Sequence, residues 1–393
     1  MKREILVINC GSSSIKFSLF RQLDGGFDIA LNGQIEELGH SAKFRFQVPQ
    51  QRSFDPVEVA PETDHRQALQ HLLQWLEPRL DPSAELLIGH RVVHGGAQFQ
   101  QPTVIDQSVL TELHKLIPLA PLHQPHNLLA IETLARLRPD VTQVACFDTA
   151  FHATQSRTVQ QFALPDHYYD DGLRSYGFHG LSYQHIANHL QQLDPALAAG
   201  KLVVAHLGNG ASLCAMDNAR SVDCSMSFTA LDGLVMGTRS GALDPGVLLY
   251  LLQDQKLQPQ QLSDLLYKES GLLGLSQLSS DMRELLDSDA ESAKRAIEIY
   301  LYRLCREIAA MAGTLQGIDG LIFTGGVGEN ATQIRQLVCE RLSWLGISID
   351  TAANSAGSEL ISSAASAIKV YVVQANEERV IAELAATAVS TEA

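Results

Sequence analysis

Two stretches of the chain share one pattern of hydrophobic and polar positions. In each, an apolar run leads into a turn of small residues and then into a second run with alternating apolar positions; they span residues 5–20 and 202–216. This pattern predicts a β-hairpin in both places. The turn glycines, Gly11 and Gly208, lie 197 residues apart, half of the 393-residue chain. The similarity is either a coincidence between two common hairpins or the mark of a duplicated α/β domain with a cleft between the copies.

Shorter patterns fill the remainder of the chain. Brief apolar runs predict strands over residues 86–94, 144–147, 320–324 and 370–373. Apolar positions at helical spacing predict helices over residues 66–76, 108–117, 127–137, 183–193, 245–253, 290–315 and 376–389. Because strands and helices alternate, the fold class is α/β. The length exceeds what one core serves, so we expect a domain of residues 1–150 plus 376–393, onto which the last helix packs back, and a second of residues 151–375.

Charge and cysteine usage narrow the possible partners. The chain has 29 Lys and Arg against 44 Asp and Glu, a net charge of −15. Such a surface repels nucleic acids and anionic membranes, so an anionic ligand needs a local basic site. The six cysteines are scattered without a CxxC pair, which predicts reduced thiols in a cytoplasmic protein rather than a zinc site or a disulfide framework. No apolar stretch approaches the roughly 20 residues of a membrane span.

Three turns of small residues could hold phosphate groups. The first is Gly11–Ser14, where Ser12 and the nearby Lys16 add a hydroxyl and a charge; the others are Gly208–Gly210 and the glycine-rich turn that follows the strand over 320–324. Such turns expose backbone N–H groups, and a helix after the third would direct its N-terminus at a nucleotide. Ordinary tight turns without a ligand are the alternative at each place. The P-loop and protein-kinase motifs are absent.

Two arginines, one aspartate and one histidine stand beside glycines or at predicted strand ends. Arg91 and Arg239 occur in glycine-rich segments, where a guanidinium can approach a carboxylate or phosphate closely; a surface salt bridge is the alternative for either. Asp148 follows a predicted strand and is a candidate for metal, arginine or proton contact. His179 precedes Gly180, and a structural histidine is its alternative.

These segments together resemble the acetokinase family of the sugar kinase–Hsp70–actin superfamily. The resemblance runs in order over nearly the whole length, through residues 9–16, 90–96, 118–123, 147–152, 176–180, 206–210, 236–241, 280–283, 325–330 and 376–378. It implies two ribonuclease-H-like (actin-like ATPase) domains with the site in the interdomain cleft. It also implies reversible phosphoryl transfer from ATP to a short-chain carboxylate, which yields an acyl phosphate and ADP.

The resemblance also implies roles for individual residues. Asn9 and Glu377 would bind Mg²⁺, for which Mn²⁺ could substitute. Arg91 and Arg239 would hold the carboxylate and the transferring phosphoryl group, His179 would stabilise the transition state, and Asp148 is the family's acid/base residue. The positions that would bind the nucleotide are Ser12, Lys16, His206, Leu207, Gly208, Asn209, Gly210, Asp281, Met282, Arg283, Gly326, Val327, Gly328, Glu329 and Asn330. A homodimer is implied by the family alone.

Two expectations go beyond this transfer of roles. A carboxylate substrate is already ionised at neutral pH and needs no base, so we hypothesise that Asp148 orients Arg91 or a Mg²⁺-bound water. The acyl pocket should be small and apolar, lined by Val93, Leu122, Phe178 and residues 228–231. Ala230 stands where the family usually has proline, which would enlarge the pocket slightly.

Acetate is therefore the expected acceptor, with propionate or butyrate as the alternative. Two readings from other classes remain: a nucleotide-gated binding protein of the actin or Hsp70 type, and an NAD enzyme. The converging cationic groups argue against the first of these. The absence of an acidic residue about 20 positions after a GxGxxG motif argues against the second.

Overall fold

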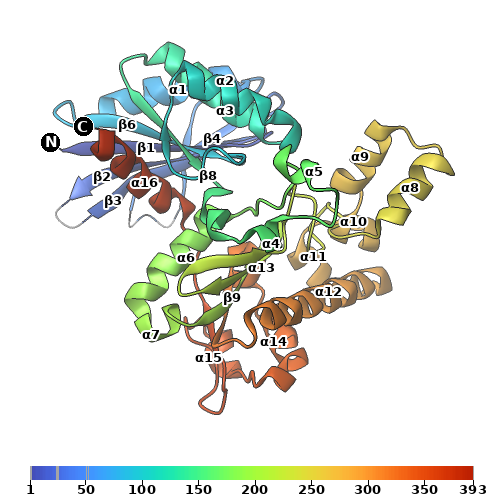
Figure 1. Cartoon of the computed structure of the whole chain (residues 1–393). Helices are drawn as coiled ribbons and strands as arrows, with labels where there is room; N and C mark the ends of the chain where they lie inside the picture. The colour runs from blue at the N-terminus through green and yellow to red at the C-terminus, as the bar shows by residue number, and fades with distance from the viewer. Residues whose placement is uncertain (1, 24–25, 50, 52, 393) are drawn as a thin grey trace. The chain divides into compact units, whose positions relative to one another are not determined.

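The chain divides into two compact units. The structure is a computed structural model that describes residues 2–23, 26–49, 51 and 53–392. Unit 1 comprises Met1–Phe151 and Asn376–Ala393, and unit 2 comprises His152–Ala375. Unit 1 therefore contains both the beginning and the end of the chain, which are blue and red in Figure 1.

Unit 1 is built on an eight-stranded mixed sheet with the order β5-β4-β3-β2-β1-β6-β8-β7. The strands are β1 (Arg3–Cys10), β2 (Ile15–Leu23), β3 (Gly26–Glu36), β4 (Lys43–Gln47), β5 (Asp55–Val57), β6 (Glu85–Val92), β7 (Thr103–Val104) and β8 (Thr142–Phe147). β1 is antiparallel to β2 and parallel to β6. The hairpin expected over residues 5–20 is thus confirmed, as are the strands expected over 86–94 and 144–147.

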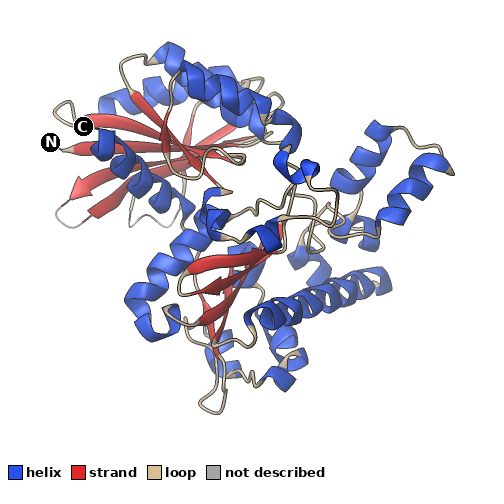
Figure 2. Ribbon diagram, in the orientation of Figure 1, coloured by secondary structure: helices blue, strands red, loops and turns tan. Residues whose placement is uncertain are grey.

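Helices cover this sheet on both faces because its central strand is apolar on both. Leu6 and Ile8 of β1 pack in one cluster with residues of α1 (His65–Leu76) and α3 (Gln124–Leu137), beside which lies α2 (Gln107–Lys115). The alternate residues of β1 are also buried and point to the opposite face, where α16 (Glu377–Glu392) packs. A Cβ atom at Gly89 of β6 would lie 2.7 Å from Ile381, so the glycine permits this close approach. The last helix packs back on unit 1, as expected (Figure 2).

Unit 2 repeats the central part of this architecture with five strands. Its sheet has the order β11-β10-β9-β12-β13, from β9 (Lys201–Leu207), β10 (Ala211–Asp217), β11 (Arg220–Cys224), β12 (Gly320–Thr324) and β13 (Lys369–Val372). β9 is antiparallel to β10 and parallel to β12, as β1 is to β2 and β6. The five strands β3-β2-β1-β6-β8 of unit 1 therefore match those of unit 2 in order and direction. This confirms the expected pair of duplicated ribonuclease-H-like α/β domains.

The helices of unit 2 pack on both the sheet and one another. They are α4 (Arg157–Gln160), α5 (His167–Asp170), α6 (Gly180–Leu193), α7 (Pro195–Ala198), α8 (Pro245–Gln253), α9 (Pro259–Lys268), α10 (Gly271–Ser276), α11 (Met282–Leu286), α12 (Glu291–Leu315), α13 (Gly325–Asn330), α14 (Thr332–Arg341) and α15 (Thr351–Ser355). α6 joins the sheet through hydrogen bonds from Ser182 to His206 and from Tyr183 to Ser212. The chain thus crosses between the units before each of these helices. Helix α6 follows β8 of unit 1 but belongs to unit 2, whereas α16 follows β13 of unit 2 but belongs to unit 1.

The structure differs from the sequence-based expectations at residues 325–330 and at several elements that were not predicted. Residues 325–330, expected as a glycine-rich turn before a helix, form the helix α13 themselves, with Gly325 at a φ of 77°. Strands β3 to β5 and helices α9 to α11 follow no pattern singled out above. Within the described part of the chain, no helix combines the length and the apolar character that crossing a membrane requires.

Candidate active site

The residues predicted for the site fall into two groups, one in each unit. Unit 1 holds Asn9, Ser12, Lys16, Arg91, Val93, Leu122, Asp148 and Glu377, whereas unit 2 holds Phe178, His179, residues 206–210, Arg239, residues 281–283 and residues 326–330. Each group is described within its own unit.

Arg91 and Asp148 form a close ion pair at the ends of neighbouring parallel strands. Arg91 is the penultimate residue of β6, and Asp148 directly follows β8. Arg91 donates from Nε to Asp148 Oδ1 over 3.0 Å and from Nη2 to Oδ2 over 2.7 Å. Burial alone would lower the pKa of Arg91, but the Asp148 carboxylate and then Glu377 outweigh this and raise it. The pair therefore holds the guanidinium in one plane, as the hypothesis for Asp148 requires.

Two further carboxylates lie on the first turn of α16. Glu377 Oε2 is 3.6 Å from Arg91 Nη1. The pKa of Glu378 is raised by burial and by the neighbouring Glu377 carboxylate, and is lowered in part by Lys16 and Arg91. Lys16 pairs with Asn9 across the β1–β2 hairpin. The sequence reasoning selected only Glu377, although two adjacent carboxylates were visible in the motif at residues 376–378.

This cluster offers the type of ligand that magnesium prefers. Asn9, Glu377 and Glu378 carry amide or carboxylate oxygens, and Mg²⁺ usually takes one or two protein carboxylates together with water and substrate phosphates. No group of three or more His, Cys, Asp or Glu side chains within residues 2–23, 26–49, 51 and 53–392 is arranged to hold a metal on its own. A metal shared with a nucleotide fits these residues, whereas an all-protein cage does not.

A buried asparagine, which the sequence reasoning missed, fixes the first hairpin. Asn127 of α3 donates from Nδ2 to the carbonyl of Cys10 over 2.9 Å and accepts from Val93 N over 3.0 Å. It thereby ties the end of β1 to the segment after β6, which carries Arg91. No local pattern marks this role, because both contacts join distant parts of the chain. Within the same hairpin, the turn closes by a 2.8 Å bond from Gly11 N to the carbonyl of Ser14, and Ser12 is exposed.

The residues expected to line the acyl pocket differ in exposure. Val93 is 6% exposed and Phe178 is 1% exposed, whereas Leu122, in the turn before α3, is 37% exposed. The carbonyl of Phe178 accepts a hydrogen bond from the buried His152 over 2.9 Å. Phe178 is thus held firmly at the segment that leads into His179.

In unit 2, His179 is held at a strained backbone position. It is the N-cap of α6 with a φ of 57°, in the left-handed region that costs a non-glycine residue of order 1 kcal/mol or more. Its Nδ1 lies 2.8 Å from Ser212 Oγ on β10. Its ring stacks on that of His206, with centroids 4.2 Å apart and an interplanar angle of 18°. The second hairpin and α6 therefore position the two imidazoles together.

Arg239 lies beside His179 and has no carboxylate partner in the described part of the chain. Its Nη1 donates to the carbonyl of Ala230 over 2.5 Å, and burial lowers its pKa. A Cβ atom on Gly210 would come within 2.6 Å of Arg239 Nη2 and 3.6 Å of His179 Nε2. The turn at Gly210 thus lies against the guanidinium of Arg239 and the imidazole of His179. A desolvated cation without a counter-ion is a site for an anion.

A pocket of about 1020 Å³ lies in unit 2 beside the same turn. Many of its lining residues were predicted to bind the nucleotide: Gly208, Asn209, Asp281, Met282, Arg283, Gly326, Val327 and Asn330. Tyr300, Thr332 and Gln333, which were not predicted, also line it. Because a Cβ atom on Gly326 would meet no atom within 4 Å, this glycine leaves open space at the pocket wall. The pocket therefore joins α13, α11 and the second hairpin turn.

The other predicted nucleotide residues of unit 2 are not among the pocket lining. His206 and Gly210 lie with His179 and Arg239, and Leu207 is fully buried in β9. Glu329 accepts hydrogen bonds from Gly325 N and Ala375 N, each over 2.9 Å, so its carboxylate serves the backbone.

A buried arginine of α14 holds α13 in place. Arg335, which is 1% exposed, donates to the carbonyl of Gly328 over 2.9 Å and to that of Glu329 over 2.8 Å. The sequence reasoning missed this residue as well, because no motif reveals its partners, which are main-chain carbonyls and the side chain of Asn354. The helix that borders the large pocket is thereby held against α14.

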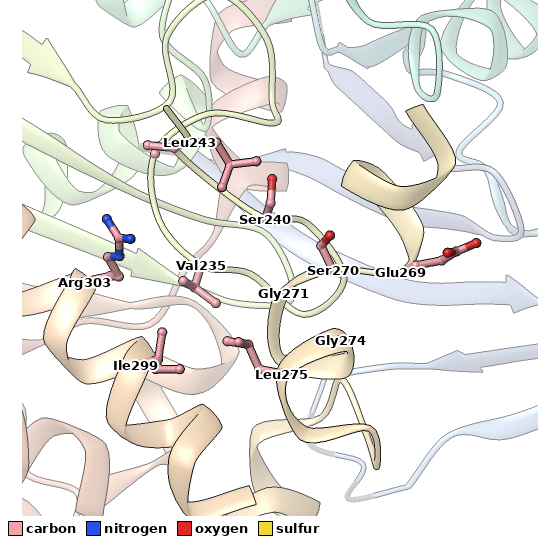
Figure 3. Close-up of a pocket in the computed structure, with 12 residues that line it drawn as sticks. Val235, Ser240, Leu243, Glu269, Ser270, Gly271, Gly274, Leu275, Ile299 and Arg303 are labelled. Carbon is pink, nitrogen blue, oxygen red and sulfur yellow. The ribbon is translucent and has the colours of Figure 1, made fainter. Parts of the chain in front are cut away.

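A smaller pocket of about 340 Å³ borders the loop that carries Arg239 (Figure 3). Ser240 and neighbouring loop residues form one wall, whereas α10 and α12 form the other. The two walls are joined by bonds from Ser270 N to the carbonyl of Thr238 over 3.0 Å and from Leu272 N to that of Met236 over 2.8 Å. Figure 3 shows Arg303 and Glu269 on opposite sides of this pocket. The start of α10 thus supports the backbone that leads into Arg239.

Comparison with known proteins shows similarity over nearly the whole chain. The model of the acetokinase family matches residues 4–383. The acetate kinase of Methylocella silvestris is 46% identical over 391 residues, covering 97% of each chain. A propionate kinase from Francisella tularensis superposes with a TM-score of 0.90 at 34% identity, covering 97% of this chain and 98% of its own. The acetate kinase of Porphyromonas gingivalis gives 0.88 at 36% identity, covering 98% and 100%. The chain therefore belongs to the acetokinase family.

Proposed function

We propose that the protein transfers the γ-phosphoryl group of ATP reversibly to acetate, with Mg²⁺, and forms acetyl phosphate and ADP. As a member of the acetokinase family it is a phosphotransferase with a carboxyl group as acceptor. The observation that carries the proposal is the half-buried Arg239, which has no carboxylate partner among the described residues and lies beside His179 and the turn at Gly210. The name of the Methylocella silvestris relative supports acetate as the acceptor.

The proposed reaction needs positioning and charge neutralisation more than covalent help. A carboxylate oxygen attacks the γ-phosphorus, the bond from that phosphorus to the bridging oxygen breaks, and ADP leaves with the electron pair. Arg239 and Arg91 would neutralise the carboxylate and the transferring group, while His179 would donate a hydrogen bond to the charge that develops. The large pocket of unit 2 would hold the nucleotide, and Lys16 and Ser12 of unit 1 would contact its phosphates.

Asp148 has a supporting part in this scheme. The attacking carboxylate carries no proton at neutral pH, so no base is required. The bidentate bond to Arg91 supports a role in orienting that guanidinium. The carboxylate also keeps Arg91 charge-compensated while the substrates are absent.

Magnesium would be held by Asn9 and Glu377, with Glu378 adjacent. When bound, the ion would neutralise phosphate charge and orient the γ-phosphoryl group. Mn²⁺ accepts the same oxygen ligands and could substitute. The raised pKa of Glu378 beside Glu377 supports this placement, because crowded carboxylates favour a cation.

Propionate is the alternative acceptor, since the Francisella tularensis structure bears that name. Val93 and Phe178 are the buried apolar candidates for the acyl pocket. One methylene in an apolar pocket is worth only about 1–3 kcal/mol. We therefore expect kcat/KM for propionate to lie within roughly two orders of magnitude of that for acetate.

Hydroxamate detection of acyl phosphate tests the reaction and the acceptor together. Acetate, propionate and butyrate are compared under Mg-ATP, with EDTA and with Mn²⁺ in place of Mg²⁺. The proposal expects acyl phosphate with acetate, a loss with EDTA and recovery with Mn²⁺. ATP binding without acyl phosphate from any acid would refute it, whereas a larger kcat/KM for propionate would replace only the acceptor.

A homodimer in the cytoplasm is a further part of the proposal. Helix α8 has no buried residue in the single chain and exposes Val247, Leu249 and Tyr250 by 42%, 54% and 53%. Such an apolar face favours a second copy as its partner. Sedimentation of the wild type and of Leu249→Glu tests this, since the substitution should yield monomers. The six free cysteines, all in the described part of the chain, support a reducing compartment.

A further inference from the structure

A buried chain of hydroxyl groups lies behind His179, and the mechanism above does not use it. Tyr183 and Ser212 are both fully buried. The Tyr183 hydroxyl lies 2.5 Å from Ser212 Oγ, and Ser212 Oγ lies 2.8 Å from His179 Nδ1. The chain therefore runs from α6 across to β10 and back to the histidine at the start of α6.

The position of His179 explains why its ring needs support from outside the helix. Its left-handed backbone sets it apart from the regular helical residues that follow, so helical side-chain preferences do not orient the imidazole. Tyr183 follows one turn later and donates its backbone N–H to the carbonyl of His179 over 3.0 Å. Both residues are thus fixed to the same helical turn, and Ser212 joins their side chains.

The Tyr183 ring is itself firmly placed. It packs edge to face against His152, with centroids 5.6 Å apart and an interplanar angle of 76°. His152 is bonded through Nδ1 to Ser221 Oγ over 2.8 Å and through Nε2 to the carbonyl of Phe178 over 2.9 Å. A Cβ atom on Gly177 would come within 2.4 Å of His152, so the glycine permits this packing. The hydroxyl therefore has little freedom to leave Ser212.

The chemistry of the two hydroxyls sets the direction of the hydrogen bonds. Burial raises the pKa of Tyr183 well above its ordinary value, so the phenol keeps its proton. A phenol is the stronger donor and an aliphatic hydroxyl the stronger acceptor, so Tyr183 donates to Ser212. Ser212 then has its own proton free to donate to an imidazole nitrogen.

We propose that Tyr183 is a positioning residue that acts through Ser212, so that neutral His179 accepts at Nδ1 and keeps its proton on Nε2. The Nε2 side faces Gly210, where a Cβ atom would lie 3.6 Å away, next to Arg239 Nη2. His179 therefore presents its Nε2–H donor next to Arg239, where the proposed reaction places an anion. This inference rests on the proposed role of His179 in phosphoryl transfer.

The tautomer of His179 is the direct test. Imidazole ¹⁵N shifts are measured by NMR on the full-length, histidine-labelled protein, and the His179 signals are assigned as those missing from His179→Asn. The wild type should show protonated Nε2 and unprotonated Nδ1. Tyr183→Phe removes only the hydroxyl and should shift His179 toward the other tautomer or a mixture. Ser212→Ala removes the middle of the chain and should do the same, which keeps the test available if Tyr183→Phe folds poorly.

Kinetics provide the second readout. Tyr183→Phe should lower kcat by about tenfold to a hundredfold, with the KM for ATP changed less than about twofold. The double variant Tyr183→Phe/Ser212→Ala should have the same kcat as Ser212→Ala alone. Tyr371→Phe is the matched control, because Tyr371 is a buried tyrosine of the same unit whose hydroxyl donates to Asp194 over 3.1 Å. It should leave both kcat and the His179 tautomer unchanged.

A wild-type His179 with its proton on Nδ1, or an unchanged tautomer in Tyr183→Phe and Ser212→Ala, would overturn the inference. Failure of the proposed function looks different. If His179→Ala formed acyl phosphate at the wild-type rate, His179 would have no catalytic role. The ¹⁵N shifts of the wild type and of Tyr183→Phe would still show whether Tyr183 sets the tautomer.

Discussion

The two arginines of the site were predicted for one task, yet their surroundings are opposite. Arg91 in unit 1 has two bonds to Asp148 and a second carboxylate, Glu377, at 3.6 Å. The guanidinium of Arg239 in unit 2 is half-buried, and within the described part of the chain it donates only to the carbonyl of Ala230. Arg91 is therefore compensated before any substrate binds, whereas Arg239 gains its counter-charge only from a ligand. In the proposed reaction, Arg91 would thus be pre-oriented, and Arg239 would supply the electrostatic attraction for the anionic ligand.

The largest expected effect is on the rate of acyl phosphate formation. Arg239→Ala and Arg91→Ala should each lower kcat/KM for acetate on the order of a thousandfold, because each removes a group that meets charge in the transition state. Hydroxamate assays measure both. Arg341→Ala, which removes an exposed partner of Glu298, is the control and should retain full activity. A loss below tenfold for either variant would remove that arginine from the proposed chemistry.

Stability should separate the same two variants. Arg91→Ala removes the arginine that forms a bidentate ion pair with Asp148, which is 2% exposed, so unit 1 should lose roughly 3–5 kcal/mol. Arg239→Ala removes a half-buried charge that has no carboxylate partner among the described residues, so unit 2 should lose little or become more stable.

The two tryptophans allow each unit to be followed alone, because Trp75 lies in unit 1 and Trp344 in unit 2. Urea unfolding is monitored by fluorescence, with Trp344→Phe as the background for Arg91→Ala and Trp75→Phe for Arg239→Ala. Equal destabilisation of the two units would contradict the contrast between the arginines.

Asp148→Asn tests what the compensation of Arg91 does. The amide has one accepting oxygen in place of two and no charge, so the two parallel bonds to the guanidinium are lost and kcat should fall about tenfold to a hundredfold. Crystallography of the variant should show Arg91 displaced. A slow variant with Arg91 in place and an unchanged dependence on Mg²⁺ would instead favour a proton-transfer role for Asp148.

The smallest effect compares the two hairpin turns. A Cβ atom on Gly210 would lie 2.6 Å from Arg239 Nη2, whereas one on Gly11 would meet only Ser14 atoms at 3.6 Å. Gly210→Ala should therefore displace the free guanidinium and lower kcat/KM by about tenfold, while Gly11→Ala stays within about twofold. Because the displaced group is a flexible side chain, neither variant should unfold. Identical kinetics of the two variants would show that Arg239 does not need its present place.

The sequence predicts the framework of this molecule better than its electrostatics. Local apolar periodicity can be seen directly in the sequence. It predicts the two hairpins, the strands at 320–324 and 370–373 and the long helix that ends at Leu315. The contrast between Arg91 and Arg239 does not follow from local pattern. Arg91 has its carboxylate partner, Asp148, 57 residues away, and no carboxylate in the described part of the chain pairs with Arg239. Asn127 was missed for the same reason, since its partners at Cys10 and Val93 are distant main-chain atoms. Arg335 was missed because bonds to the carbonyls of Gly328 and Glu329 leave no pattern in the sequence. Residues 325–330 were expected as a turn, and glycine ordinarily opposes helix formation. The segment is nevertheless helical, because Arg335 donates to its carbonyls and the Glu329 carboxylate accepts from Gly325 N.

The exchange of α6 and α16 has a consequence for biosynthesis. As the chain leaves the ribosome, the strands of unit 1 are complete by Phe147, yet one apolar face of their sheet stays uncovered until α16 is made more than two hundred residues later. Unit 2, whose helix α6 precedes its strands, can assemble in the meantime. We therefore expect nascent unit 1 to depend on chaperones for that interval, and shortened chains that stop before Asn376 to aggregate through the bare face.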